Sequence, residues 1–291
     1  MEIKKTTDHA IVGVVTAVLL IGVIVAVISL VQSVYVPKIM EQREADHMDK
    51  VAEQFAHLTS VIHGQAADKT PGIPIATSIT LGSKELPYLL SVRSYGALEI
   101  LEDATAIMVN NRTASGGIKT SQFKINCISY SSSNAYFLDQ TYIYEAGAMI
   151  VGQTNGNLMM IHPAFFVDLD NQNKTVTLSF NMVKISSVGQ KTIAAGYGTY
   201  PVQTEFHEIS VNKTFIDVSQ IILATSYTNA WSMFLNSSLT KAGLNLNGYG
   251  SDFSLFDSGE TLKLEFDADL DVKFFFKIID IKTQIGPGWI E

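Results

Sequence analysis

The chain has almost no cysteine. Among its 291 residues only Cys127 carries a thiol, so no disulfide can form within one chain. Small secreted domains that are held together by disulfides are therefore excluded. Cys127 lies in the apolar run FKINCISY, a setting that favours a buried, inert thiol over a reactive one. The fold must depend on its own hydrophobic core.

Charge is also scarce, and positive charge is the scarcer sign. Charged residues make up 16% of the chain, and 20 Lys and Arg against 28 Asp and Glu give a net charge of −8. Glu2, Lys4, Lys5 and Asp8 cancel one another, so the surplus negative charge lies beyond residue 34. An acidic body argues against nucleic acid as a partner and against a polybasic grip on anionic lipid.

Common catalytic motifs are missing. We find no phosphate-binding glycine loop, no G-x-S-x-G turn and no H-E-x-x-H helix. Glu53 and His57 form an i, i+4 pair, but the sequence indicates no third metal ligand. His162 and His207 stand alone in strand-like segments and are expected to be structural. We expect no cofactor and no enzymatic activity.

Against this background stands one long apolar run, AIVGVVTAVLLIGVIVAVISLV, at residues 10–31. It contains no charge and has no polar face at a 3.6-residue period. As a helix it is about 33 Å long, close to the thickness of the hydrocarbon core of a bilayer. We therefore predict a membrane-spanning or filament-core helix at residues 10–34, after a short cytoplasmic lead at residues 1–9. Its apolar contacts with the lipid bilayer are represented by Ala10, Ile11, Leu20, Ile24 and Val31.

The run differs from a cleaved signal peptide, because it exceeds the usual apolar core of about 7–15 residues and no A-x-A site follows it. Flanking lysines and arginine give little preference for orientation. The four N-x-[S/T] sequons all follow the run; their candidate glycosylated residues are Asn111, Asn173, Asn212 and Asn236. We therefore expect a single-pass protein of the cell membrane, with its N-terminus inside and everything beyond Tyr35 outside.

Residues 35–64 are predicted to continue the helix as an amphipathic stalk. Pro37 can kink the helix without ending it, because the helical pattern resumes at once. Gly64 is the expected end. An apolar stripe runs along this segment at spacings of three and four residues: Met48, Val51, Phe55, Leu58 and Ile62. Either the following domain or neighbouring copies must cover the stripe, and its lack of an evident partner favours assembly.

The rest of the chain is predicted to be rich in strands. Residues 65–74 have the composition of a linker, and residues 75–291 form the extracellular domain. The candidate strands are 75–80, 90–93, 98–101, 106–109, 123–130, 141–150, 158–169, 175–185, 202–211, 218–223, 261–266 and 272–281. The run FFFKIID is too continuously apolar for a half-exposed strand and predicts a central one.

One helix is expected among these strands, near residues 226–242. Its apolar face is Trp231, Phe234, Leu235 and Leu239. The predicted fold is therefore α+β: a long N-terminal helix followed by a mainly antiparallel, sandwich-like domain with one helix.

Asp168, Asp170 and Asn173 resemble the opening of a calcium loop. The segment lacks glycine at the sixth position, and Ser179 stands where the bidentate acid belongs. Asp and Asn are also common in hairpin turns. We favour the turn and assign no metal.

The charged lead MEIKKTTDHA, the span IVGVVTAVLLIGVIVAVISLVQ and the amphipathic continuation to about residue 62 resemble archaeal type IV pilin-like surface proteins, the group that includes archaellins. Beyond residue 64 the similarity is one of architecture. The resemblance implies membrane insertion, trimming of the lead by a prepilin-type peptidase, and self-association through N-terminal helices. Asp8-His9-Ala10 differs from the Lys/Arg-Gly junction that such peptidases often prefer.

The sequence thus favours a pilin-like cell-surface protein, anchored in the membrane or forming extracellular filaments, with a β-rich head for adhesion or surface contact. The alternative is a monomeric, membrane-tethered module that binds carbohydrate or calcium. A third, a membrane-tethered hydrolase, requires a cleft that joins His162 or His207 to a carboxylate and a hydroxyl.

Overall fold

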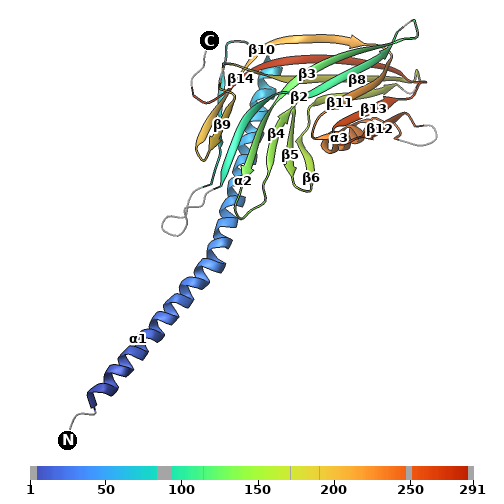
Figure 1. Ribbon diagram of the computed structural model, residues 1–291. Coiled ribbons are helices and arrows are strands. Elements are labelled where there is room, and N and C mark those ends of the chain that lie inside the picture. Colours follow the sequence, from blue (N-terminus) through green and yellow to red (C-terminus); the bar gives the residue numbers. More distant parts are fainter. Residues whose placement is uncertain are drawn as a thin grey trace.

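The protein has one long N-terminal helix and a β-rich head, as predicted. The computed structural model describes residues 5–83, 94–113, 115–170, 172–189, 191–246 and 251–287, with side chains from residue 11 onward. The candidate strand at 90–93 lies outside these residues. Figure 1 shows the first part of the helix projecting away from the head and the second part running into it. The head is a large, mostly antiparallel β-structure with one short helix, so the fold is α+β.

The N-terminal helix is continuous from one end to the other. It consists of α1 (Lys5–Leu30), a π-helical turn η1 (Val31–Tyr35) and α2 (Val36–Asp68). The π-helical turn lies directly before Pro37, whose ring collides with the carbonyl four residues earlier in a regular α-helix. A wider turn relieves that collision. The helix therefore passes through Pro37, as predicted.

The helix does not end at Gly64. It continues to Asp68 and ends at Lys69, which adopts the left-handed conformation (φ 54°) and donates its N–H to the Gln65 carbonyl at 3.0 Å. The first residues of the expected linker are helical because they are packed. The Gln65 Nε2 donates to the Thr204 carbonyl at 2.7 Å, and Ala66 is buried. Such packing outweighs the cost of about 1 kcal/mol for a glycine inside a helix.

The strands and the second helix follow in this order: β1 (Ile75–Thr80), β2 (Tyr95–Arg112), β3 (Ile118–Ser133), β4 (Thr141–Glu145), β5 (Ala148–Gln153), β6 (Gly156–Ile161), β7 (Ala164–Asp170), β8 (Thr175–Ser187), β9 (Ile193–Gly196), β10 (Thr199–Phe215), β11 (Val218–Ala224), α3 (Thr228–Lys241), β12 (Phe253–Asp257), β13 (Thr261–Phe266) and β14 (Asp271–Ile285).

Several predicted strands need revision. Segments 98–101 and 106–109 belong to the single strand β2, whose register shifts between Leu101 and Thr105. Segment 141–150 is instead the hairpin β4–β5, which turns at Ala146 and Gly147, both with positive φ. Apolar residues on both sides of that turn hide it from a sequence-based search. Segment 158–169 is likewise two strands, and β9 and β12 were not predicted.

The strands form two connected sheets. One has the order β1-β10-β14-β8, with β7 pairing with β8, and the other contains β3-β2-β11-β13-β12, with β4, β5, β6 and β9 beside them. The bridge Asn126↔Ile185 links β3 to β8. The pair β14–β8 is parallel, whereas the other strand pairs among the described residues are antiparallel. The FFFKIID run lies in β14, between β10 and β8, as predicted.

The head has two hydrophobic cores on opposite faces of the same strands. On β8, Val176, Leu178, Phe180 and Met182 face a core shared with α3, whereas Val183 and Ile185 face a core around α2. The predicted apolar face of α3, from Trp231 to Leu239, is buried in the first core. Because neighbouring side chains in a strand point to opposite faces, one sheet can cover both helices.

We expect Phe55→Ala to destabilise the head by about 3–5 kcal/mol, because it opens a cavity in the core around α2. Phe55 is fully buried, and its ring centroid lies 6.0 Å from that of Tyr142. Met233→Ala is the matched control, since Met233 is 55% exposed and should change stability by less than about 0.5 kcal/mol. Urea unfolding in detergent measures both. Equal effects would contradict the docking of α2.

Candidate functional site: the projecting helix and its socket

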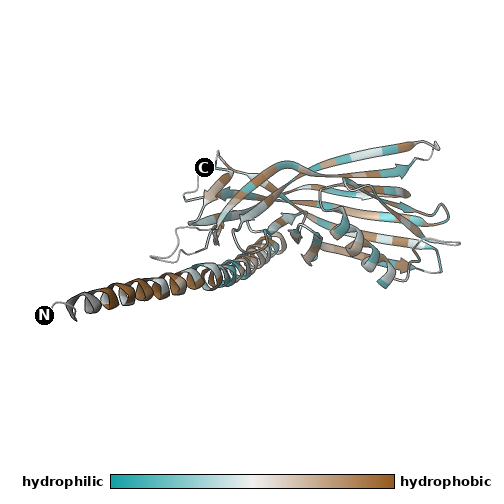
Figure 2. Ribbon diagram, turned by 60° about the horizontal axis from the view of Figure 1, so that its bottom comes forward, coloured by the Kyte–Doolittle hydropathy of each residue, from teal (hydrophilic) through white to brown (hydrophobic). Residues whose placement is uncertain are grey.

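The outer part of the N-terminal helix is bare. Its large apolar side chains from Ile11 to Leu30 are 49–65% exposed, on every side of the helix. Figure 2 shows this part as predominantly hydrophobic, in contrast to the mixed surface near the head. It is the one described helix that is long and apolar enough to cross a membrane. Three of the predicted lipid-facing residues, Ile11, Leu20 and Ile24, are exposed here.

The two ends of the predicted span differ in their surroundings. Ala10 lies within α1. Val31, at the other end, is half-buried and packs against a small cluster of Val36 and Met40. The exposed apolar surface therefore gives way to packed surface at the π-helical turn.

Polar side chains in the projecting part are satisfied within the helix. The Thr16 hydroxyl donates to the Val12 carbonyl at 2.8 Å, and the Ser33 hydroxyl donates to the Ser29 carbonyl at 2.7 Å. In an apolar medium an unpaired hydroxyl costs several kcal/mol, and back-bonding to the carbonyl four residues earlier avoids that cost. These hydroxyls are thus compatible with lipid or with packed helices.

The stripe on α2 is covered by the head. All five of its residues are at most 1% exposed and belong to the core around α2. Strands β1, β4, β5, β10 and β14 lie against this helix. Of the two partners that the sequence left open, the head is the one the structure places on the stripe. The stripe therefore has its partner within the chain, and the inference of assembly from a stripe without a partner is wrong.

A buried carboxylate fixes the first part of α2 to the head. Glu44 is 0% exposed, and its two oxygens accept the backbone N–H groups of Ala135 at 3.1 Å, Tyr136 at 2.7 Å and Phe137 at 2.8 Å. Such charge-assisted bonds are stronger than those between neutral groups. In the sequence, Glu44 stands four residues before Met48 and so shares the face of the stripe. That spacing was the available signal.

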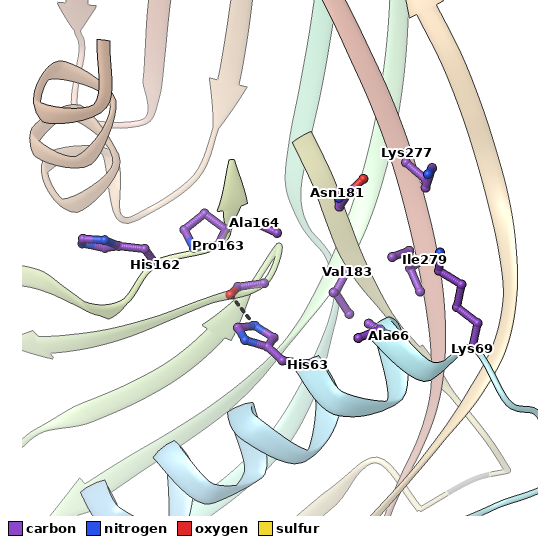
Figure 3. A pocket seen from close by; sticks show the side chains of 12 residues that line it. His63, Ala66, Lys69, His162, Pro163, Ala164, Asn181, Val183, Lys277 and Ile279 are labelled. Carbon is purple, nitrogen blue, oxygen red and sulfur yellow. Dashed lines mark hydrogen bonds between the residues drawn. The ribbon is translucent and has the colours of Figure 1, made fainter. Parts of the chain in front are cut away.

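Two histidines on the stalk are structural. The His47 Nε2 donates to the Tyr130 hydroxyl at 3.3 Å, and that hydroxyl donates to the Leu81 carbonyl at 2.9 Å. Burial lowers the pKa of His47 and raises the pKa of Tyr130, so both side chains are neutral at pH 7. The His63 Nε2 donates to the Gly147 carbonyl at 2.8 Å, as Figure 3 shows.

These polar contacts are distributed along the packed helix. Glu44 lies near its start and Gln65 near its end, about 32 Å apart at the helical rise. Between them, Gln54 forms two hydrogen bonds with Thr80, at 2.9 Å and 3.2 Å. The head is therefore fixed to the helix along the length of α2, and its orientation relative to the projecting part is set.

We expect Glu44→Gln to reduce stability by about 1–3 kcal/mol, because the amide replaces one acceptor oxygen by a donor that faces a backbone N–H. Glu41→Gln is the matched control on an exposed face of the same turn. Limited proteolysis should cut the Glu44→Gln variant faster near residues 134–138. Equal proteolysis of both variants would contradict this role.

A second buried carboxyl lies in the first core. Glu145, at the end of β4, is 1% exposed and accepts hydrogen bonds from the Trp231 Nε1 at 2.8 Å and the Thr225 hydroxyl at 3.0 Å. Burial raises its pKa to about 7, and these two donors only partly offset that shift. Nothing in the sequence singled it out. It ties α3 and β11 to the β4–β5 hairpin.

Glu145 makes stability depend on pH. Its pKa is about 7 in the folded chain against an ordinary 4.5, so unfolding releases a proton between these values and stability falls as pH rises through that range. We expect the loss from pH 4.5 to 8 to be smaller in Glu145→Gln than in the wild type, by on the order of 2–3 kcal/mol. Urea unfolding measures it. Glu260→Gln, at an exposed site, should keep the wild-type pH dependence; an unchanged dependence in Glu145→Gln would contradict the assignment.

The four sequon asparagines differ in accessibility. Asn173 is exposed in the β7–β8 turn, and Asn212 is exposed on β10 beyond the part that pairs with β1. Asn236 is half-buried on α3, where its Oδ1 accepts the Thr240 hydroxyl at 3.2 Å. Asn111 is half-buried between β3 and β11. Asn173 and Asn212 are therefore the more accessible candidates.

The calcium-like segment is a hairpin turn. Asp170 accepts the Gln172 N–H at 2.9 Å and the Asn173 Nδ2 at 2.8 Å, and it pairs with Thr175 across the turn. Its oxygens thus serve the turn, as favoured. Asp168, two residues earlier on β7, is exposed. Among the described residues, no group of three or more His, Cys, Asp or Glu is arranged to hold a metal ion.

His162 and His207 differ in their surroundings. His162 is exposed and lies 5.0 Å from Phe234 between ring centroids. The described residues that line its two neighbouring pockets include no carboxylate. His207 is exposed, 4.0 Å from Glu208, and interacts electrostatically with Asp280, whose carboxylate accepts the Ser210 hydroxyl at 3.1 Å. Among the described residues, the cleft that a hydrolase would need is therefore not formed around His162.

Neither family models nor curated proteins match this chain.

Proposed function

We propose that this chain is a pilin-like cell-surface protein that residues 10–34 hold in a membrane and whose β-rich head is displayed outside the cell for adhesion or surface contact. The observation that carries the proposal is an exposed apolar helix that continues directly into α2, which is packed in the head. Its side chains from Ile11 to Leu30 are exposed all round, whereas those on α2 are seated in the head.

The physical reason is the hydrophobic effect. Each fully buried Val, Leu or Ile gains about 1.5–3 kcal/mol over the exposed side chain, and nothing in the described head covers α1. The projecting helix therefore needs an apolar surrounding, and its length matches that of a bilayer. The accessible sequon at Asn173 fits an outward-facing head, and we propose Asn173 as the glycosylated site.

A filament is the second candidate, in which the projecting helices of several copies pack together after a prepilin-type peptidase trims the lead. The rigid seating of α2 favours it, because heads with a fixed orientation can repeat in register along a filament. Because the head covers the stripe on α2, the contacts between copies in this version are made by α1.

The role that we propose is one of binding and display, without catalysis. The monomeric, membrane-tethered binding module shares the same anchor and differs in the absence of polymerisation.

We expect Ile24→Asp to abolish stable anchoring, because a charge at the centre of a span costs about 2.5–3.5 kcal/mol on insertion scales. Membrane pelleting followed by carbonate extraction measures the anchored fraction. Ile118→Asp is the matched control, since Ile118 is 70% exposed on the head. If Ile24→Asp pelleted as fully as this control, the single-span proposal would be wrong.

The filament version has its own test. Surface material is sheared from cells, viewed by electron microscopy and subjected to N-terminal sequencing. Filaments whose subunits begin near residue 10 would support assembly. Recovery of membrane-bound monomers that begin at Met1 would overturn assembly and leave the anchor intact.

A further inference from the structure

A pocket of about 310 Å³ lies where the end of α2 meets β8 and β14, on the face of these strands that α2 covers. Figure 3 shows His63, Ala66 and Lys69 from the helix on one side and Asn181, Lys277 and Ile279 from the strands on the other. The volume is at the lower end of the range for small-molecule sites, about 300–1,000 Å³. It therefore has room for one small ring with its substituents.

The charge of the pocket is opposite to that of the chain. The described residues that line it include Lys69 and Lys277 but no aspartate or glutamate, although the chain has a net charge of −8. Neither ammonium forms an ion pair with a described residue. Lys277 is half-buried beside Asn181, its register partner on β8. This set of donors is complementary to an anionic group that also offers neutral acceptors.

An exposed aromatic shelf adjoins the pocket. Phe166 pairs with Ser179, and Ser179 pairs with Phe275, so the three side chains stand in one row across β7, β8 and β14. The two phenylalanines are 64% and 47% exposed. The row lies two residues from Asn181 and Lys277 along the strands, about 7 Å away on the same face, and its two aromatic Cα positions are about 10 Å apart. Exposed apolar groups beside a polar pocket are typical of ligand sites.

We propose that this pocket and shelf bind an acidic saccharide, a short sugar chain whose rings carry carboxylates. The apolar face of a sugar ring packs on Phe275 and Phe166, whose ring faces carry partial negative charge and attract the C–H groups of the sugar. The carboxylate of the neighbouring ring enters the pocket, where Lys277 and Lys69 provide charge. The Asn181 amide donates to and accepts from the hydroxyl groups.

His63 helps to shape the pocket. Because its Nε2–H is used by the Gly147 carbonyl at 2.8 Å, Nδ1 is the ring nitrogen left to hydrogen-bond a sugar hydroxyl. The hydrogen bond also fixes the ring between α2 and the β4–β5 hairpin. His63 therefore serves as a positioning residue as well as a lining one.

This inference deepens the proposed function by naming the ligand class of the head, and it rests on that function only in placing the head outside the cell. Binding is measured on purified protein, so its failure would leave the anchor untouched. Loss of anchoring in Ile24→Asp would likewise say nothing about the pocket.

The test uses the full chain in detergent micelles, produced in a host that does not attach N-linked glycans, so that Asn212 stays bare beside Lys277. The probes are digalacturonate, neutral galactobiose and acetate, and calorimetry with ligand-detected NMR measures binding. Digalacturonate should bind at least about tenfold more tightly than either other probe. Galactobiose lacks the carboxylate and so loses a charge-assisted hydrogen bond, and acetate lacks the sugar ring that packs on the phenylalanines.

Three variants locate the site. Lys277→Ala should weaken digalacturonate binding by about ten- to a hundredfold, and Phe275→Ala should weaken it as well. Lys273→Ala is the matched control, because Lys273 lies four residues away on the same face of β14 and pairs with Asp271 at 3.5 Å. It should bind as the wild type does. Lys277→Gln keeps more of the side chain and replaces Lys277→Ala if that variant unfolds.

Several outcomes would overturn the proposal. Absence of digalacturonate binding at millimolar concentration, or equal losses in the variants at 277 and 273, would remove the site. Equal binding of galactobiose would remove the acidic class, and equal binding of acetate would reduce the pocket to an anion site without a saccharide.

Discussion

The packing of α2 against one face of the curved sheet is the contact on which the rest of the structure depends. It determines where the projecting helix leaves the head, and it divides the head into two cores. The strands β4, β8 and β14 supply side chains to both. A sheet that is buried on both faces needs nearly continuous apolar sequence, and TYIYE meets this requirement.

Buried polar groups give this contact its orientation. Apolar packing alone tolerates many arrangements of similar volume, whereas a buried donor or acceptor must meet its partner. The Glu44 carboxylate and the His47–Tyr130 pair therefore restrict how the helix can slide or rotate in its socket. Glu145 performs the equivalent task for α3, at the cost of a carboxyl whose pKa is raised by burial.

The fixed helix also determines where a ligand would be met. The proposed pocket lies at the end of α2 near Lys69, about 50 Å along the helix from residue 34, the expected edge of the membrane. A site at this height is clear of lipid head groups. The proposed anchor and the proposed ligand site thus lie at opposite ends of one helix, whose fixed position in the head keeps them apart.

Local periodicity determined much of this fold. The 3.6-residue pattern predicted the helix through Pro37, the stripe and α3, because a helix is set by residues close in sequence. Strand composition predicted the β-rich head and the central position of β14. One helix end and one turn were predicted wrongly. The helix continues past Gly64 because Gln65 and Ala66 pack against the head, which the local sequence cannot show. The β4–β5 turn is hidden because apolar residues flank it on both sides.

Tertiary structure alone decided the rest. The apolar stripe on α2 predicts that one face of the helix is covered, but it does not identify the covering surface. Only the folded head shows that β-strands, rather than neighbouring copies, cover it. The pocket is built from α2, β8 and β14, segments more than eighty residues apart in the chain. Nothing in the sequence distinguishes its two lysines from others. The described residues around them include no carboxylate, and this arrangement arises only when the three segments meet.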